Sequence, residues 1–200
     1  MIRRSIAKPI TGALVRLCGL TLVSAVLYGS MHGSEARAFP MASDGASVGA
    51  GCPVRPRVRS SHPYLRAMID EAVVRSSTFR RIIGAIEATD GIVYVEHGDC
   101  KHGVHACLVL DVTAAATCRI LRVTVDARQP DWDVMASIGH ELRHALEVLE
   151  NPGLADTASV YLFYAQAHQE KDRPFETGAA IDAGLAVRKE VTSFARGRPN

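Results

Sequence analysis

Two histidines four residues apart, with a glutamate directly after the first, form the segment of this chain with the clearest chemistry. The order is His140-Glu141-Leu142-Arg143-His144. On an α-helix, residues four apart lie on the same face one turn from each other, so both imidazoles can reach one metal ion. The carboxylate of Glu141 could then take a proton from a water held by the metal. The pattern predicts a metal centre with Glu141 as the catalytic residue.

The residues around this motif predict the helix that it needs. We expect the helix to run from Trp132 to Glu150, where an Asn-Pro-Gly turn ends it. Apolar residues cluster on one side of this helix, at Val134, Ile138, Leu142, Ala145 and Leu149. The two histidines and Glu147 fall on the opposite side. The alternative interpretation is a solvated helix face that carries two histidines and binds no metal.

A third metal ligand has to come from another part of the chain. Glu147 shares the metal face, but it lies a further turn along the helix, so we interpret it as a residue that orients His144 or lines the cleft. Glu176 opens a later predicted helix whose small residues would allow a close approach to the motif helix; they are Gly178, Ala179 and Ala180. Glu176 is therefore a candidate for the third ligand, with Glu170 and His168 as alternatives.

The motif helix resembles the active-site helix of the zincin metallopeptidases, and the similarity extends from about Ile92 to the C-terminus. Residues 121–125 (LRVTV) resemble the substrate-aligning edge strand of that fold. Because no glycine or third histidine follows His144 at the metzincin spacing, the similarity is to the gluzincins. It implies Zn²⁺ bound by His140, His144 and a glutamate from a downstream helix, for which we expect Glu176. It also implies hydrolysis of a peptide or protein substrate.

Zincins also need a hydrogen-bond donor for the oxyanion that develops during hydrolysis. Tyr161, Tyr164 and His168 recur at helical spacing between the motif and Glu176, and one of them could be that donor. The alternative interpretation of this aromatic stripe is core packing.

The remaining segments predict an α+β fold. Helical patterns precede and follow a set of short β-branched strands, so we expect a small antiparallel sheet that packs against the motif helix and further C-terminal helices. The expected helices lie at about 61–75, 77–90, 132–150, 155–168 and 175–194, and the expected strands at 92–96, 105–113 and 119–126.

The N-terminal residues predict export. A basic start is followed by an uncharged apolar stretch and then by the small residues Ala36 and Ala38, an order typical of a secretory signal peptide. We predict a signal peptide over residues 1–38, a flexible lead-in over 39–60 and a single zincin-like domain over 61–200. The protein would then be periplasmic or secreted. An uncleaved anchor is the alternative for the leader.

Four cysteines follow the predicted leader, at Cys52, Cys100, Cys107 and Cys118. An even number of cysteines in an exported chain predicts two disulfides, with three possible pairings. Three histidines lie near the second and third of these cysteines, at His97, His102 and His105. A structural metal knot is the alternative there, although we favour a disulfide that involves Cys100 or Cys107.

The composition excludes several other classes of protein. The 200-residue chain carries 23 Lys and Arg against 21 Asp and Glu, a net charge of +2, and 48% of its residues are hydrophobic. Such an apolar fraction excludes a wholly disordered chain. The small charge, without a basic block, predicts no nucleic-acid partner. We expect membrane contact only if the leader is not cleaved.

Two functions are compatible with these patterns. The first is an exported zinc-dependent hydrolase, a metallopeptidase. The second is a non-catalytic exported metal-binding or interaction protein with a structural zinc site. The number of protein ligands distinguishes them, because a catalytic zinc keeps an open coordination position and a structural zinc does not.

Overall fold

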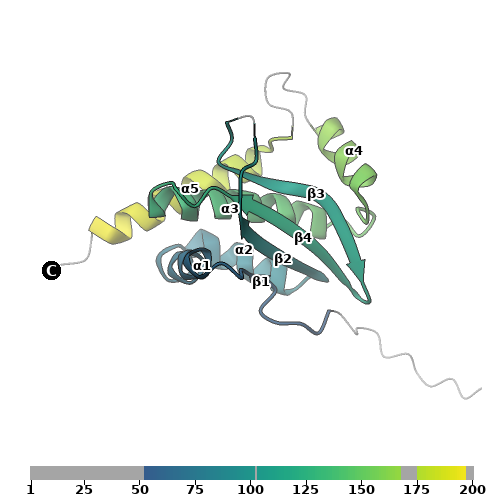
Figure 1. The fold of residues 1–200 in the computed structure, drawn as a ribbon, viewed down its shortest axis with the longest axis horizontal. Coiled ribbons are helices and arrows are strands. Elements are labelled where there is room, and N and C mark those ends of the chain that lie inside the picture. The colour runs from purple at the N-terminus through teal and green to yellow at the C-terminus, as the bar shows by residue number, and fades with distance from the viewer. Residues whose placement is uncertain (1–51, 102, 168–174, 197–200) are drawn as a thin grey trace, which may run out of the picture. The chain divides into compact units, whose positions relative to one another are not determined.

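The computed structural model of this protein describes residues 52–101, 103–167 and 175–196. These residues form an α+β fold, as the sequence predicted (Figure 1). No helix within these ranges is long and apolar enough to cross a bilayer. The predicted leader and residues 39–51 lie outside the described residues. The elements in chain order are β1 (Val58–Arg59), α1 (Pro63–Arg75), α2 (Ser77–Glu87), β2 (Gly91–His97), β3 (Ala106–Ala115), β4 (Cys118–Val125), α3 (Asp131–Leu149), α4 (Thr157–Ala167) and α5 (Gly178–Arg196).

The sheet is mixed, with the strand order β1-β2-β4-β3. β2 pairs in parallel with both β1 and β4, whereas β3 pairs antiparallel with β4. The predicted antiparallel sheet was therefore wrong except for the β3–β4 hairpin. The loop of residues 98–105 carries the chain past one strand position, so β4 returns between β2 and β3 (Figure 1). Residues 121–125 consequently lie in the sheet interior, and the edge strand is β3 instead.

Strand β3 contains an irregularity in its pairing with β4. Val109 lies opposite Arg122 and Thr113 lies opposite Ile120, so three residues of β3, 110–112, face the single residue Leu121. Extra residues of this kind bend a strand and interrupt its hydrogen-bond ladder. The regular pairing of β3 is thereby divided into two short halves.

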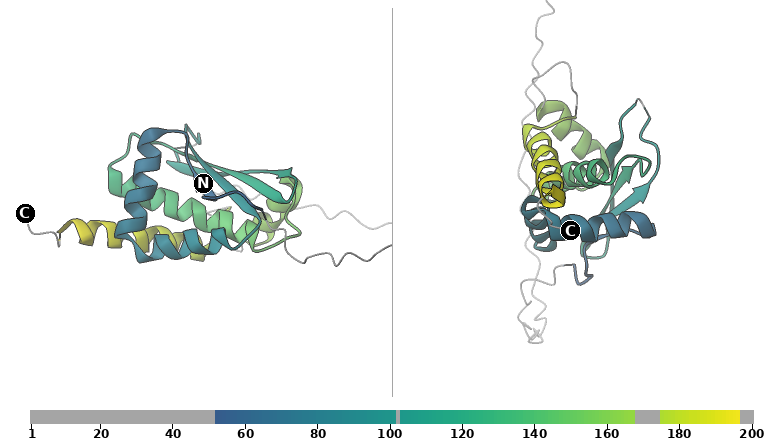
Figure 2. Two further views of the ribbon diagram at one scale, coloured as in Figure 1. Left: turned by 90° about the horizontal axis from the view of Figure 1, so that it is seen from below. Right: turned by 90° about the vertical axis from the view of Figure 1, so that its left-hand side faces the viewer.

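Helix α3, which carries the motif, lies between the sheet and α5 (Figure 2). The predicted apolar side is buried, from Val134 to Leu149. His144 and Glu147, on the other side, are also only 4% and 7% exposed. The alternative of a solvated helix face is therefore contradicted.

Two glycines allow α3 and α5 to approach each other closely. A Cβ on Gly139 would lie 2.9 Å from the Cγ2 of Val187, and a Cβ on Gly184 would lie 3.2 Å from the Cβ of His140. The sequence had suggested Gly178, Ala179 and Ala180 for this role. Of these three residues Ala180 is fully buried, whereas Gly178 and Ala179 are exposed.

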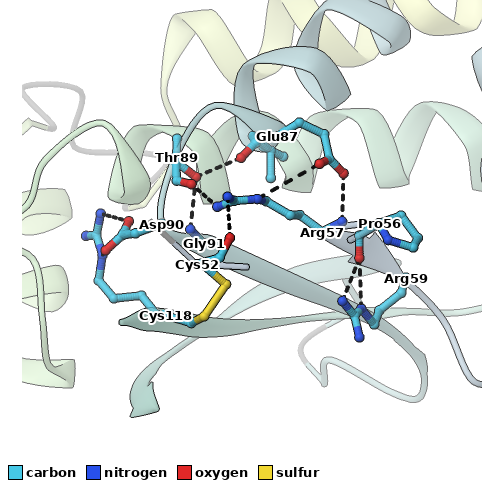
Figure 3. The surroundings of a disulfide bond; sticks show 11 residues. Cys52, Pro56, Arg57, Arg59, Glu87, Thr89, Asp90, Gly91 and Cys118 are labelled. Atoms are coloured by element: carbon cyan, nitrogen blue, oxygen red, sulfur yellow. Dashed lines mark hydrogen bonds and ion pairs between the residues drawn. A yellow bond between two sulfur atoms is a disulfide. The ribbon is translucent and has the colours of Figure 1, made fainter. Parts of the chain in front are cut away.

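Residues 52–60 belong to the folded domain, although the sequence placed them in a flexible lead-in. A disulfide joins Cys52 to Cys118, and β1 adds to the edge of β2 (Figure 3). The buried Arg57 donates from its backbone to the carboxylate of Glu87 at 2.7 Å and from its guanidinium to the carbonyl of Cys52 at 2.7 Å. The composition of this segment is typical of a loop, and it is held in place by the disulfide, the strand pairing and the hydrogen bonds to distant residues.

The second disulfide joins Cys100 to Cys107. Of the three possible pairings, the structure therefore has 52–118 and 100–107. The metal-knot alternative is contradicted, because thiols bonded to each other cannot ligate an ion. Two disulfides indicate an oxidising environment such as that of an exported protein.

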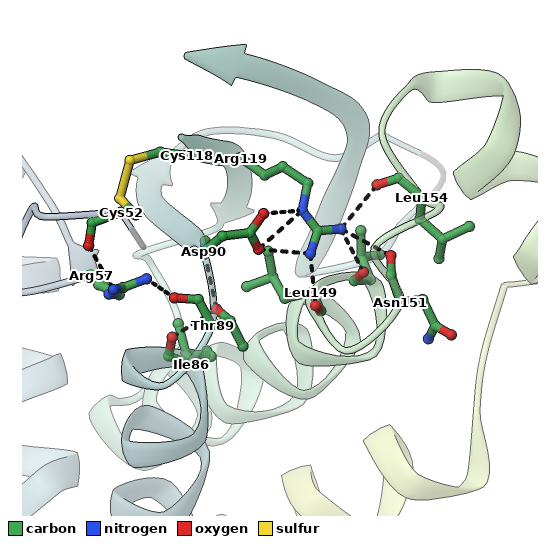
Figure 4. A network of polar contacts seen from close by, with 12 residues as sticks. Cys52, Arg57, Ile86, Thr89, Asp90, Cys118, Arg119, Leu149, Asn151 and Leu154 are labelled. Atoms are coloured by element: carbon green, nitrogen blue, oxygen red, sulfur yellow. Dashed lines mark hydrogen bonds and ion pairs between the residues drawn. A yellow bond between two sulfur atoms is a disulfide. The ribbon is translucent and has the colours of Figure 1, made fainter. Parts of the chain in front are cut away.

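Arg119, the residue after Cys118, connects the sheet to the C-terminus of α3 (Figure 4). Its guanidinium makes a bidentate ion pair with Asp90, at 2.7 Å to Oδ1 and 2.9 Å to Oδ2. It also donates to four carbonyls at or beyond the end of the helix, those of Val148, Leu149, Asn151 and Leu154. The carbonyls of Val148 and Asn151 also accept backbone N–H groups, those of Asn151 and Leu154. A cation at the C-terminal end of a helix also complements the helix dipole.

Candidate metal centre

The structure brings the three predicted ligands together. His140 and His144 lie one turn apart on α3, and Glu176 lies just before α5. One ligand atom from each residue lies within 4.8 Å of the others. The Nε2 atoms of His140 and His144 are 3.1 Å and 4.0 Å from Oε2 of Glu176. Ligands of one tetrahedral Zn²⁺ lie about 3.3 Å apart, so this donor set fits such an ion after small side-chain rotations.

Glu147 determines which nitrogen of His144 faces the cluster. Its Oε2 lies 3.1 Å from Nδ1 of His144, and both side chains are buried. A carboxylate at Nδ1 requires a proton there, so the lone pair is on Nε2, the nitrogen that points to Glu176. Although burial raises it, hydrogen bonds from His144 and Thr177 hold the pKa of Glu147 below its ordinary value. This contact agrees with the orienting role predicted for Glu147.

Thr177 extends this arrangement to the third ligand. Its hydroxyl donates to Oε1 of Glu147 at 2.8 Å and accepts a bond from the backbone N–H of Ala180 at 3.1 Å. The second bond is an N-terminal cap of α5. Glu176 thus precedes the helix that it was predicted to open. Thr177 was missed in the sequence, although a threonine before a run of helix-forming residues is a cap signal.

His140 is held by groups from both helices. Burial lowers its pKa, but the hydrogen bond with Glu176 and the charges of Glu141 and Glu176 raise the pKa above its ordinary value overall. The backbone of Ala180 acts on this pKa in the same direction. A Cβ at residue 184 would lie 3.4 Å from Nδ1 of His140, so the glycine there leaves the space that the imidazole needs beside α5.

Glu141 lies on α3 beside the three candidate ligands, and the residue is only 6% exposed. Its Oε1 is 3.9 Å from Nε2 of His140. Burial raises its pKa, against the opposing effects of the two histidines. A buried carboxylate with a raised pKa, next to a group that could hold a metal ion, is a candidate functional residue.

The two tyrosines differ in their positions. Tyr164 is 1% exposed, and its hydroxyl donates to the carbonyl of His144 at 2.9 Å and lies 3.4 Å from Oε2 of Glu147. Burial raises its pKa. Tyr161 is 51% exposed, and its ring packs on Phe175. Both oxyanion-donor assignments stay predictions. The alternative ligands His168 and Glu170 lie outside the described residues.

Two cavities open at the ligand cluster. The larger has a volume of about 950 Å³ and extends over the start of α3 and along α5. The smaller has a volume of about 180 Å³ and lies between β3, α4 and Phe175. Both are lined by Glu141 and Glu176. The candidate metal centre therefore borders two cavities that share part of their lining.

The chain matches no family model, no curated protein and no solved structure. Its function is therefore argued from the geometry of the site.

Replacing Glu147 with glutamine should weaken Zn²⁺ binding about 10- to 100-fold, the usual cost of removing a carboxylate that orients a histidine ligand. Competition with a chromophoric chelator measures this affinity. The matched control is Glu150→Gln on the same helix, an exposed residue that pairs only with Arg143 among the described contacts. Equal affinity in the two variants would contradict the orienting role of Glu147.

Proposed function

We propose that this protein is an exported zinc-dependent hydrolase that cleaves peptide bonds. One observation carries the proposal, which is the buried carboxylate of Glu141 beside the His140–His144–Glu176 cluster, at the base of an open cleft. Two histidines and one carboxylate are the ligand set of several zinc peptidases. The two disulfides support an oxidising compartment.

The roles of the residues follow from their positions. His140, His144 and Glu176 would hold the ion. Zn²⁺ in such a site lowers the pKa of a water molecule and polarises a carbonyl oxygen. Glu141 takes one proton from the attacking water, whose oxygen forms a bond to the peptide carbon. As the carbon–nitrogen bond breaks, Glu141 returns that proton to the leaving amine.

The competing function is a structural zinc site in a non-catalytic exported protein. Among the described residues, the one group of side chains that could hold an ion has three members. Three protein ligands leave a coordination position for water or substrate, whereas a structural zinc has four. The cleft over the cluster also favours a catalytic role, because structural sites are closed.

Elemental analysis of the purified protein, together with digestion of denatured casein, tests the proposal. We expect about one zinc per chain in the wild type and a loss of both zinc and hydrolysis in His144→Ala. The control His105→Ala, a histidine whose side chain is 65% exposed on the loop before β3, should keep the metal. A zinc-loaded wild type that cleaves no peptide would favour the structural function, and a folded wild type that takes up no zinc would overturn both.

A further inference from the structure

The two cavities at the site meet at the catalytic residues. Four residues line both of them, Glu141 and Glu176 from the cluster and Val104 and Ala106 from the opposite wall. A peptide whose scissile bond lies at Glu141 would therefore extend into both cavities. A side chain in the smaller cavity would lie against Glu141, His144 and Glu176, so it would belong to a residue directly next to the cleaved bond.

The smaller cavity has apolar walls. β3 contributes Leu108 and Leu110, α4 contributes the ring of Tyr164, and Phe175 closes the side next to Glu176. Its volume of about 180 Å³ is below the roughly 300–1,000 Å³ of pockets for small-molecule ligands. That volume suits a single side chain.

Two of the polar groups in these walls have partners outside the metal centre or are bonded covalently. The Tyr164 hydroxyl donates to the carbonyl of His144, and the sulfur of Cys107, which also lines the cavity, is bonded to Cys100. The other polar side chains there are those of Glu141, His144 and Glu176. A charged substrate side chain would lose its hydration without gaining a partner of its own.

The larger cavity has no comparable preference for one kind of substrate side chain. Its volume is about 950 Å³, which accommodates several residues. The charged side chains that line it pair with each other, Arg128 with Asp126 at 2.7 Å and Arg188 with Asp133 at 2.9 Å. Paired charges of this kind favour neither acidic nor basic substrates.

We propose that the smaller cavity is the specificity pocket of the enzyme and that Leu108, Leu110 and Phe175 determine its preference. This inference rests on the proposed peptidase function. The substrates are then extended peptide segments with one apolar residue of the size of Val, Leu, Ile or Met directly next to the cleaved bond. Substrate residues that bind in the larger cavity affect the choice of cleavage site only weakly.

Cleavage-site mapping tests the pocket. The zinc-loaded protein is incubated with a library of synthetic peptides of equal length, and the products are identified by mass spectrometry. Wild type should cleave next to Leu, Ile, Val or Met roughly 10- to 100-fold more often than next to Asp, Lys or Gly, the range expected for burial of such a side chain. Leu110→Ala should shift cleavage toward Phe and Trp, and Leu110→Phe should shift it toward Ala. The matched control is Val109→Ala, because Val109 lies opposite Arg122 on the other face of β3 and should leave the pattern unchanged.

A binding measurement separates this inference from the proposed function. In zinc-loaded Glu141→Gln, calorimetry compares two acetylated tetrapeptide amides that differ only in Leu or Asp at one central position. The Leu peptide should bind at least tenfold more tightly, and Leu110→Ala should remove most of that difference. Cleavage without an apolar preference, or a preference unchanged in both Leu110 variants, overturns the pocket and leaves the peptidase function standing. No cleavage of any peptide by zinc-loaded wild type overturns both.

Discussion

Replacing Glu141 with glutamine is expected to leave the metal bound and to lower peptide hydrolysis by about 10²- to 10⁴-fold, the usual contribution of a general base. Glutamine has almost the same shape as glutamate, but its amide cannot accept the proton of the attacking water. The three ligands are other residues, so the zinc content should stay near one ion per chain. Measuring kcat/KM at equal zinc content gives the size of the effect.

The control for this experiment is Glu150→Gln, which removes an exposed carboxylate directly after the last residue of α3. Its kcat/KM should match that of the wild type. Hydrolysis by Glu141→Gln at more than a tenth of the wild-type rate would remove Glu141 from the role of catalytic base. A loss of zinc in the same variant would instead indicate that Glu141 is a ligand.

Arg119→Leu is expected to lower the free energy of unfolding by about 1–3 kcal/mol, the typical cost of leaving a buried hydrogen-bond acceptor without its partner. Arg119 is 6% exposed and donates to Asp90 and to the carbonyls that follow α3 (Figure 4). Leucine would remove the donor to the buried carbonyl of Leu149 and the ion-pair partner of Asp90, and a buried acceptor without a partner is costly. Urea denaturation followed by circular dichroism measures the loss.

Arg122→Leu is the matched control, since Arg122 lies on the same strand but pairs with Asp111 at the surface. Its effect should stay below about 1 kcal/mol, as for other exposed pairs. Equal unfolding free energies for the two arginine variants would contradict the connecting role of Arg119.

The hydrogen bond from Arg119 lowers the pKa of Asp90. A lowered pKa in the folded state contributes stability above the unfolded value of about 3.9, and that contribution is lost as the pH falls through the folded value. The difference in unfolding free energy between wild type and Asp90→Asn should therefore narrow below pH 4.

The sequence predicted the motif helix and its ligands because that information is local. Helical spacing alone places His140 and His144 on one face, and the ends of α3 lie within one residue of those expected. Glu147 was set aside because it lies a further turn along the same helix, and Glu176 was preferred because the resemblance implied a ligand from a downstream helix. In the structure Glu176 lies with the two histidines in a group that could hold an ion, and Glu147 contacts the nitrogen of His144 that faces away from it.

The parts that were missed depend on contacts between distant residues. Strand periodicity shows which side chains are buried, but it does not give strand order, so the position of β4 between β2 and β3 could not be read. Residues 52–60 have the composition of a loop and are ordered by a disulfide and by Glu87. The role of Gly139 could not be predicted, because a side chain at this position would collide with Val187, which lies on another helix.

The irregular pairing of β3 has a consequence for the behaviour of the protein at high concentration. Within the described part of the chain, β3 is an edge strand, and exposed edges can pair with a second chain and initiate aggregation. Cross-β association needs about six or seven regular residues in a row. Four residues of β3, Ala106–Val109, pair regularly with β4 before residues 110–112 interrupt the ladder. The interruption therefore protects the molecule against edge-to-edge polymerisation while the first half of the strand remains straight beside the cleft.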